Sequence, residues 1–334
     1  MPIPVKDVTS DYESLLKRQQ SVADTLMSTL RQLGKEHPSL IAATVKLLDS
    51  DGSVHSPFRM LPFPVLGALT ADQDPALPVV MCSRIWWTGA EVLDDLADGD
   101  FHPAEVGLSP SQATVASAAC LGDIPQTLIQ RLDLPQDVRA AWAREFASGS
   151  LRAAEGQLRD VSVGPHGSAW PETMRIYVGK SGAPYGRDMA MTAMLAGAGA
   201  VAEWRAFGHL FGVLRQMAND RDATSADEDK DLANGTRTLL VALAADALEE
   251  TETAVFRDLR VRATRDAHAR RELWQFLTQP DITTAYNRQI RLIHRKLSEL
   301  LKALTDACGH QNLIQWMINV SAQRALLTVG TGVA

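Results

Sequence analysis

Cysteine is scarce in this chain, and both a basic excess and a long apolar run are missing. The three cysteines lie far apart and form no CxxC pair, which argues against a disulfide framework or a zinc site and favours a reducing cytoplasm. Acidic residues outnumber basic ones by 40 to 33, so we expect no nucleic-acid or anionic-lipid partner. The most apolar stretch, Met189 to Ala202, is shorter than the roughly 18 residues of a transmembrane span. No apolar core follows the first charges, so no signal peptide is expected.

A helical pattern is present along nearly the whole chain. The apolar residues of segment 15–30 recur at 7-, 4- and 4-residue steps, which places them on one helix face, and Ser109-Pro110 has the form of a helix start. Convincing alternating strands are absent, and no break has the composition of an interdomain linker. The sequence therefore predicts an all-α fold with residues 1–334 in a single domain. Several central helices are expected within 171–222, and further helices at 135–160, 237–257, 267–278, 281–306 and 311–328.

The first acidic cluster is the DDxxD pattern of Asp94, Asp95 and Asp98. Positions i and i+4 share one helix face, so Asp94 and Asp98 project side by side and repel each other unless a cation lies between them. Mg²⁺ takes oxygen ligands and usually binds through one or two carboxylates plus substrate phosphates. A solvated acidic helix end is the alternative. The mostly apolar segment 79–93 before the cluster favours a position at the mouth of a buried cavity.

The second acidic cluster follows the hydrophobic segment 207–214 and contains Gln216, Asn219, Asp220 and Asp222. A solvated, Asp-rich loop is again the alternative interpretation. Two acidic patches at two helix ends, more than a hundred residues apart in the chain, would together suit a multi-metal diphosphate site.

Six short motifs follow one another along the chain: Arg59-Met60-Leu61-Pro62, Asp94 to Asp98, Glu155-Gly156-Gln157 with Asp160, Lys180-Ser181-Gly182, Phe207 to Asp220, and Lys230 to Leu239. In their order they resemble those of the trans-polyprenyl diphosphate synthases, a family of class I isoprenoid synthases. The resemblance implies an all-helical bundle around a deep apolar cavity, where three Mg²⁺ ions bridge both acidic motifs and the diphosphate of an allylic substrate. It also implies a homodimer and a contact between Lys180 and the diphosphate.

The chain departs from this family at the second substrate site, which chain-elongating members build for isopentenyl diphosphate. Arg59 is kept, but Phe58, Leu61 and Trp87 stand at other positions that are polar or basic in the family. The segment 99–112 also lacks the arginine pair of the family. Because an unpaired dianion is costly to desolvate, we expect that isopentenyl diphosphate is not bound in the usual way.

The second metal motif is also altered, because Asn219 stands where the family has its first Asp. An Asn at this point resembles the NSE motif of terpene cyclases, whose ligands sit at i, i+4 and i+8. Those positions are Asn219, Ala223 and Asp227. Ala223 cannot bind a metal, and Thr224 or Asp222 could take its place. Candidates for the third ion are Asn219, Asp220, Asp222 and Asp227.

The substrate pocket is expected along the helix that carries the first motif. Trp86 and Trp87 are candidates for guiding a carbocation, because aromatic faces stabilise cations, although core packing explains them equally well. In the family, the residue five positions before the first Asp often closes the pocket. Here it is Gly89, so the pocket is expected to reach Trp86 and to hold a C15–C20 chain. Candidates for binding the diphosphate and its surroundings are Lys180, Arg175, Gln157, Gln216, Arg221 and Lys230.

The sequence thus predicts Mg²⁺-dependent ionisation of an allylic prenyl diphosphate, followed by cyclisation of the carbocation. Asp94 and Asp98 would ligate two Mg²⁺ ions with support from Asp95, while Asn219 and one acidic neighbour would hold the third. The first alternative is prenyl transfer, either chain elongation or attachment to another acceptor such as an aromatic ring. The second is a non-catalytic subunit of a synthase, against which the intact DDLAD segment argues. A cytoplasmic location is expected.

Overall fold

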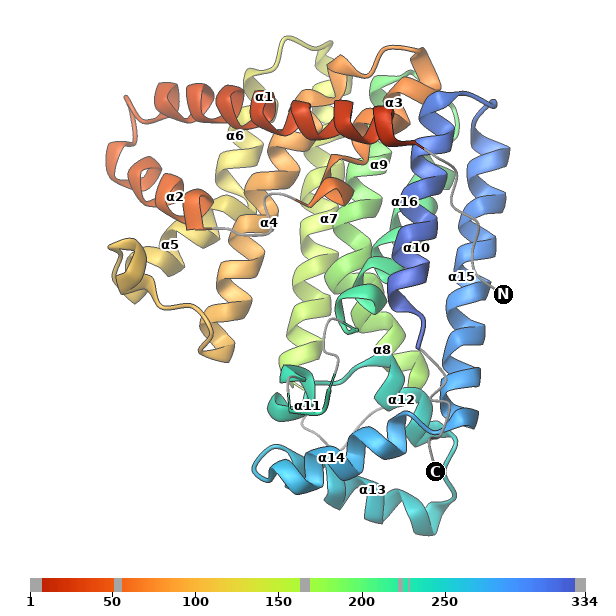
Figure 1. Cartoon of the computed structure of the whole chain (residues 1–334). Coiled ribbons are helices and arrows are strands. Elements are labelled where there is room, and N and C mark those ends of the chain that lie inside the picture. The colour runs from red at the N-terminus through yellow and green to blue at the C-terminus, as the bar shows by residue number, and fades with distance from the viewer. Residues whose placement is uncertain (1–7, 51–55, 163–168, 222–224, 228, 328–334) are drawn as a thin grey trace.

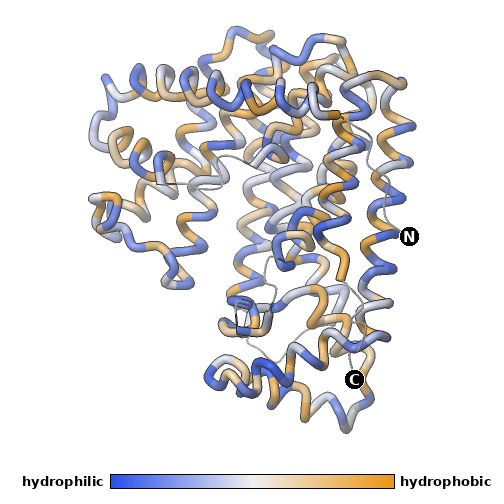
Figure 2. The backbone as a smooth tube through the Cα atoms, in the orientation of Figure 1, coloured by the Kyte–Doolittle hydropathy of each residue, from blue (hydrophilic) through white to orange (hydrophobic). Residues whose placement is uncertain are grey.

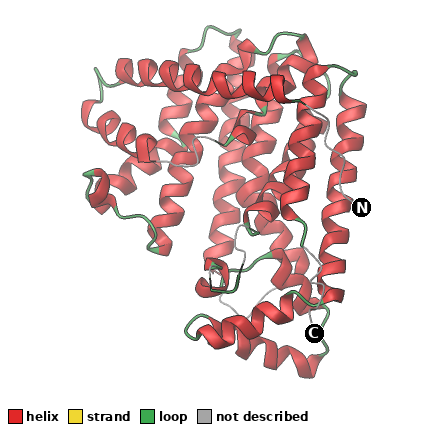
Figure 3. Cartoon of the chain, viewed as in Figure 1, coloured by secondary structure: helices red, strands yellow, loops and turns green. Residues whose placement is uncertain are grey.

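Helices make up the regular structure of the computed structural model, and no strand occurs in its described residues, 8–50, 56–162, 169–221, 225–227 and 229–327 (Figure 3). The predicted all-α fold class is confirmed. The α-helices are α1 (Thr9–Leu33), α2 (Pro38–Ser50), α3 (Pro62–Thr70), α4 (Leu77–Asp98), α5 (Pro110–Leu121), α6 (Asp123–Arg131), α7 (Gln136–Ser162), α8 (Trp170–Tyr177), α9 (Ala183–Leu195), α10 (Val201–Asn219), α11 (Lys230–Asn234), α12 (Leu239–Asp246), α13 (Glu250–Ala263), α14 (Ala267–Leu277), α15 (Pro280–Leu304) and α16 (Gly309–Ala325). Shorter turns are η2 (Pro57–Met60), η3 (Asp74–Ala76), η4 (Pro103–Val106) and η5 (Val178–Gly182).

Local sequence signals explain where several helices begin and end. The Ser109 side chain accepts from the backbone N–H of Gln112 and the Gln112 side chain accepts from that of Ser109, so α5 starts with a capping box at the predicted place. Helix α4 ends at Gly99, which has a φ of 80° in the left-handed region. The first acidic motif therefore occupies the last turns of α4.

One predicted helix is divided in the structure. The central helices expected within 171–222 are α8, α9 and α10, with the single π-helical turn η5 between α8 and α9. The segment expected from 237 to 257 is divided between α12 and α13, because the buried apolar run LLVALAAD gives way to a charged helix capped by Glu249 and Glu252. Such divisions lie beyond a periodicity argument, because each half keeps the helical pattern.

The centre of the bundle is the packing of α7, α9 and α10 against one another (Figure 1). Helix α10 approaches the backbone of α9 and η5 closely, since a Cβ at Gly212 would lie 2.3 Å from the carbonyl oxygen of Ser181. Gly156 of α7 makes a similar approach, because its Cβ would lie 2.4 Å from the backbone nitrogen of Lys180. These two contacts bring the motifs of α7, η5 and α10 together.

The remaining helices enclose this centre. Helix α1 crosses one end of the long helices, and α13 and α14 cross the other (Figure 1). One hydrophobic cluster extends from Val8 to Leu327, and the long helices present both polar and apolar residues (Figure 2). The single-domain organisation stays a prediction. Among the helices that can be described, none combines the length and apolar character needed to cross a membrane.

Candidate active site

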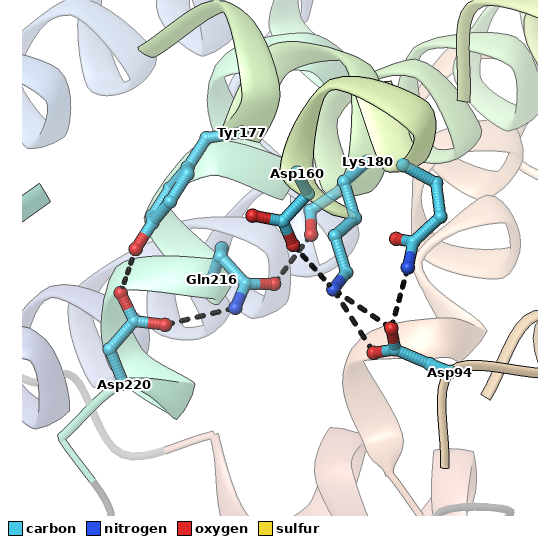
Figure 4. A network of polar contacts seen from close by, with 8 residues as sticks. Asp94, Asp160, Tyr177, Lys180, Gln216 and Asp220 are labelled. Atoms are coloured by element: carbon cyan, nitrogen blue, oxygen red, sulfur yellow. Dashed lines mark hydrogen bonds and ion pairs between the residues drawn. The ribbon is translucent and has the colours of Figure 1, made fainter. Parts of the chain in front are cut away.

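Four residues of the predicted motifs meet where α4, α7 and η5 converge, and we call them the polar cluster: Asp94, Gln157, Asp160 and Lys180 (Figure 4). The Lys180 Nζ lies 3.2 Å from Oδ1 and 3.0 Å from Oδ2 of Asp94. It also lies 3.0 Å from Oδ2 of Asp160. Gln157 Nε2 donates to Asp94 Oδ1 at 2.7 Å. Both oxygens of the predicted metal ligand Asp94 therefore already have donors.

The electrostatics of the polar cluster favour the charged form of its lysine. Burial by itself lowers the pKa of Lys180, but the nearby Asp94 and Asp160 carboxylates outweigh burial and raise this pKa. A fixed ammonium group between two half-buried carboxylates can exchange these acids for an anionic ligand. This is the behaviour expected of a diphosphate contact.

The other acids of the first motif lie at the exposed end of α4. Burial and the Asp94 charge raise the pKa of Asp95 and that of Asp98 above their usual values. A bound cation would offset both the burial and the mutual repulsion of these carboxylates. Carboxylate oxygens fit a hard divalent cation such as Mg²⁺. Lys230 pairs instead with Asp100, at 3.0 Å on the surface.

A second hydrogen-bonded group, the Asp220 network, links Tyr177, Ser181, Gln216 and Asp220 beside the polar cluster (Figure 4). Ser181 Oγ donates to Gln216 Oε1 at 2.6 Å, and Gln216 Nε2 donates to Asp220 Oδ1 at 2.9 Å. The Tyr177 hydroxyl donates to Asp220 Oδ2 and accepts from the backbone N–H of Leu239 at 3.1 Å. Asp220 is therefore oriented towards η5, on the side where Lys180 lies.

Two further acids, Asp229 and Asp231, face Asp220 across a cavity of about 20 Å³, which is room for about one water molecule. Burial and the Asp231 charge raise the pKa of Asp220 to about 8. Burial and the Asp229 charge raise the pKa of Asp231 to about 6. These two acids are not among the predicted site residues, although Asp231 lies in one of the six motifs.

The rest of the second motif is dispersed. Asn219 accepts from Arg215 at 3.0 Å, and Asp227 lies on the surface, where it pairs with Arg271 at 3.1 Å. Asp222, Ala223 and Thr224 lie outside the described residues. Within the described part of the chain, no three His, Cys, Asp or Glu side chains are gathered to hold a metal. Asn219 and Asp227 of the predicted i, i+4, i+8 set therefore contact different arginines, and the ligand set stays a prediction.

Two of the predicted diphosphate contacts also have other neighbours. Arg175 is exposed and pairs with Glu172 at 2.6 Å. The guanidinium of Arg221 lies 5.6 Å from the ring centre of Trp274, at the cavity of Asp229 and Asp231. The structure therefore brings Lys180, Gln157 and Gln216 together, but neither of these arginines joins them.

Below the polar cluster, towards the middle of the bundle, lie Arg59, Glu91, Trp87, Tyr185 and Arg215, which we call the inner cluster. Arg59 and Glu91 form an ion pair, and the Arg59 guanidinium lies 4.9 Å from the ring centre of Trp87. The rings of Trp87 and Tyr185 are 5.7 Å apart. The interior was expected to be apolar, but here an Arg–Glu ion pair lies beside aromatic rings. Sequence reasoning missed Glu91, Tyr185 and Arg215.

The predicted floor of the pocket also differs. A Cβ at Gly89 would lie 2.7 Å from Cys120 Cβ and 2.7 Å from the Ser117 carbonyl oxygen, so this glycine permits close packing of α4 on α5 rather than lengthening a pocket. Trp86 is buried, and the guanidinium of Arg187 lies 4.9 Å from its ring centre. The interpretation of Gly89 as an opening is therefore wrong, while Trp86 borders a buried, charged group.

Comparison with solved structures decides the fold. No family model matches the sequence, and no curated protein is similar to it. A geranylgeranyl pyrophosphate synthetase from Pyrococcus horikoshii Ot3 superposes with a TM-score of 0.76 at 19% identity, over 92% of this chain and 98% of the other. The chain has the all-helical isoprenoid synthase fold.

Two other structures extend this finding to further organisms. A geranylgeranyl pyrophosphate synthetase from the archaeon Geoglobus acetivorans gives a TM-score of 0.70 at 18% identity, over 93% of this chain and 98% of the other. A geranylgeranyl pyrophosphate synthase from Corynebacterium glutamicum, complexed with isoprenyl diphosphate and magnesium, gives 0.75 at 14% identity, over 96% and 100%. The resemblance noted in the motifs is thus confirmed at the level of the isoprenoid synthase fold.

Proposed function

We propose that this protein is a Mg²⁺-dependent prenyltransferase that ionises an allylic prenyl diphosphate. The observation that supports it most is the position of Lys180 between Asp94 and Asp160, next to the network that orients Asp220. The solved structures of similar fold are prenyl diphosphate synthases, one of them complexed with magnesium. They favour prenyl transfer over the cyclisation that the sequence alone suggested.

Some residues of the chain would bind the diphosphate and the metal, and others would shield the carbocation from water. Lys180 would bind the diphosphate, and Gln157 would keep Asp94 oriented. Asp94 and Asp98, with Asp220 across the site, would hold Mg²⁺, which neutralises charge on the departing diphosphate. Trp87 and Tyr185 would exclude water from the carbocation and present aromatic faces to it.

Cyclisation is the second candidate, and the ion pair of Arg59 with Glu91 favours it. In this pair the one retained arginine of the second substrate site is already neutralised by a carboxylate. A second diphosphate would have to displace or oppose that negative charge. A substrate chain of C15–C20 and a cytoplasmic location remain part of the proposal.

A product assay separates these functions. Geranyl, farnesyl and geranylgeranyl diphosphate are each incubated with Mg²⁺, with and without isopentenyl diphosphate, and the products are read by mass spectrometry. Longer linear diphosphates formed only with isopentenyl diphosphate would establish elongation. Hydrocarbons or alcohols formed without it would establish cyclisation. The Asp94→Asn variant is the control, and the absence of diphosphate release from the unaltered protein would contradict the proposal and favour a non-catalytic subunit.

A homodimer is the proposed assembly, and α7 offers a surface for it. Leu151, Leu158 and Val161 are 72%, 60% and 63% exposed, respectively. They follow one another at 7- and 3-residue steps, which places them on one helix face. Large apolar side chains aligned in this way are typical of a protein–protein interface.

A further inference from the structure

We propose that Glu91 is the proton acceptor that ends the reaction, taking a proton from the carbocation formed in the inner cluster. This inference rests on the proposed function, because it needs an ionised allylic substrate. It holds for prenyl transfer and for cyclisation, since the cation must lose a proton in either case. Glu91 belongs to none of the motifs that carried the sequence argument.

The depth of Glu91 in the bundle is the first support. Glu91 lies three residues before Asp94 on α4, which is about 4.5 Å nearer the centre along the helix axis and on the same face. On the opposite wall, Tyr185 follows Lys180 by five residues, again towards the centre. A diphosphate held by Lys180 and by metal at Asp94 would place its allylic carbon one layer further in. That layer is the inner cluster.

The surroundings of Glu91 are the second support. Its side chain is 34% exposed and that of its partner Arg59 is 13% exposed. Arg59 lies over Trp87, which contacts Tyr185 of α9. The ion pair of Glu91 with Arg59 is therefore held beside the ring of Trp87, near α9.

The chemistry of the step is balanced without any further reactant. The C–O bond of the allylic diphosphate breaks, and the electron pair leaves with the diphosphate. After prenyl transfer or ring closure, a C–H bond next to the cationic carbon breaks and its electrons form the new C=C bond. The proton passes to a carboxylate oxygen of Glu91. An ion-paired carboxylate is a weak base, but a carbocation is so strong an acid that the transfer is favourable.

The test measures two quantities for each variant, namely the diphosphate released and the alkene product formed. Glu91→Gln keeps the shape of the side chain but removes the base. We expect diphosphate release to continue, while the ratio of the original alkene to diphosphate falls roughly tenfold or more, because a positioned base typically contributes 10²–10⁴-fold. Water-quenched alcohols or alkenes with a shifted double bond should replace the original product. Glu91→Asp should restore part of the ratio.

Glu145→Gln is the matched control, because it also removes a carboxylate from an Arg–Glu ion pair, here with Arg205 and outside both clusters. Its ratio should stay close to that of the unaltered protein. If Glu91→Gln does not fold, the double variant Arg59→Leu/Glu91→Leu removes both charges together and should show the same fall. An unchanged ratio in Glu91→Gln, or an equal fall in Glu145→Gln, would overturn this inference alone. Absence of diphosphate release from the unaltered protein would overturn the proposed function as well.

Discussion

Replacing Lys180 by methionine should strengthen Mg²⁺ binding in the absence of diphosphate. The ammonium group lies 3.0 Å from Oδ2 of Asp94 and 3.0 Å from Oδ2 of Asp160. A metal ion on Asp94 would therefore sit beside a positive charge that already satisfies the carboxylate. Diphosphate removes this obstacle by attracting Lys180 to itself, so the two ligands should bind cooperatively.

The size of the effect follows from Coulomb's law. Two unit charges 4 Å apart interact by about 1 kcal/mol in bulk water, and a divalent ion experiences about 2 kcal/mol. The polar cluster is half-buried, which lowers the local dielectric constant and makes this a lower bound. About 2 kcal/mol corresponds to roughly a 30-fold change in affinity. Mg²⁺ should therefore bind Lys180→Met at least about 30-fold more tightly than the unaltered protein.

Isothermal titration of MgCl₂, with and without inorganic diphosphate, measures this coupling. Diphosphate should increase Mg²⁺ affinity strongly in the unaltered protein and much less in Lys180→Met. Lys230→Met is the control, because it removes an equal charge from the same acidic end, where Lys230 is 76% exposed and pairs with Asp100. Equal Mg²⁺ affinity in Lys180→Met and the unaltered protein, or an equal gain in Lys230→Met, would refute the reasoning.

Three further predictions concern stability and assembly. Gly156→Ala would place a methyl group 2.7 Å from the backbone of Gly179, so we expect a loss of about 1–3 kcal/mol and a lower unfolding temperature. Because the pKa of Asp220 is raised to about 8 in the folded protein, this carboxyl loses its proton at lower pH in the unfolded chain. The free energy of unfolding should therefore fall as the pH rises from about 4 to 8. Urea titrations should show a smaller fall for Asp220→Asn. Leu158→Lys should shift the proposed dimer to a monomer in analytical ultracentrifugation. The unfolding temperature of this monomer should equal that of the unaltered protein at concentrations where it is monomeric.

The fold was accessible from sequence because helical periodicity and end signals are local. The capping box at Ser109 and the left-handed Gly99 act within one helical turn, so the chain displays them directly. The places at which 171–222 divides into separate helices were not accessible. One of them is η5, a π-helical turn whose Gly179 meets Gly156 of α7 at close range, and a contact between distant segments leaves no periodic signal.

The candidate site was predictable only where a motif fixed the residue type. Lys180, Gln157 and Asp94, each taken from a motif, lie in contact with one another. Glu91 was missed because an acid at position 91 matches no motif, and only the structure shows its ion pair with the mostly buried Arg59. Gly89 was misinterpreted because the sequence does not show whether a glycine in a helix borders a pocket or packs against a neighbouring helix.

Three acids of this site share one property, which is that each already has a partner within the protein. Asp94 is held by Lys180, Asp220 by Tyr177 and Glu91 by Arg59. Substrate and metal must therefore displace these internal partners before they can bind the side chains. Such an exchange makes binding of one ligand depend on the other, because each freed partner remains half-buried and costly to leave unpaired. Ionisation would then begin only when diphosphate and Mg²⁺ are both present, which protects the inner cluster from water until a substrate covers it.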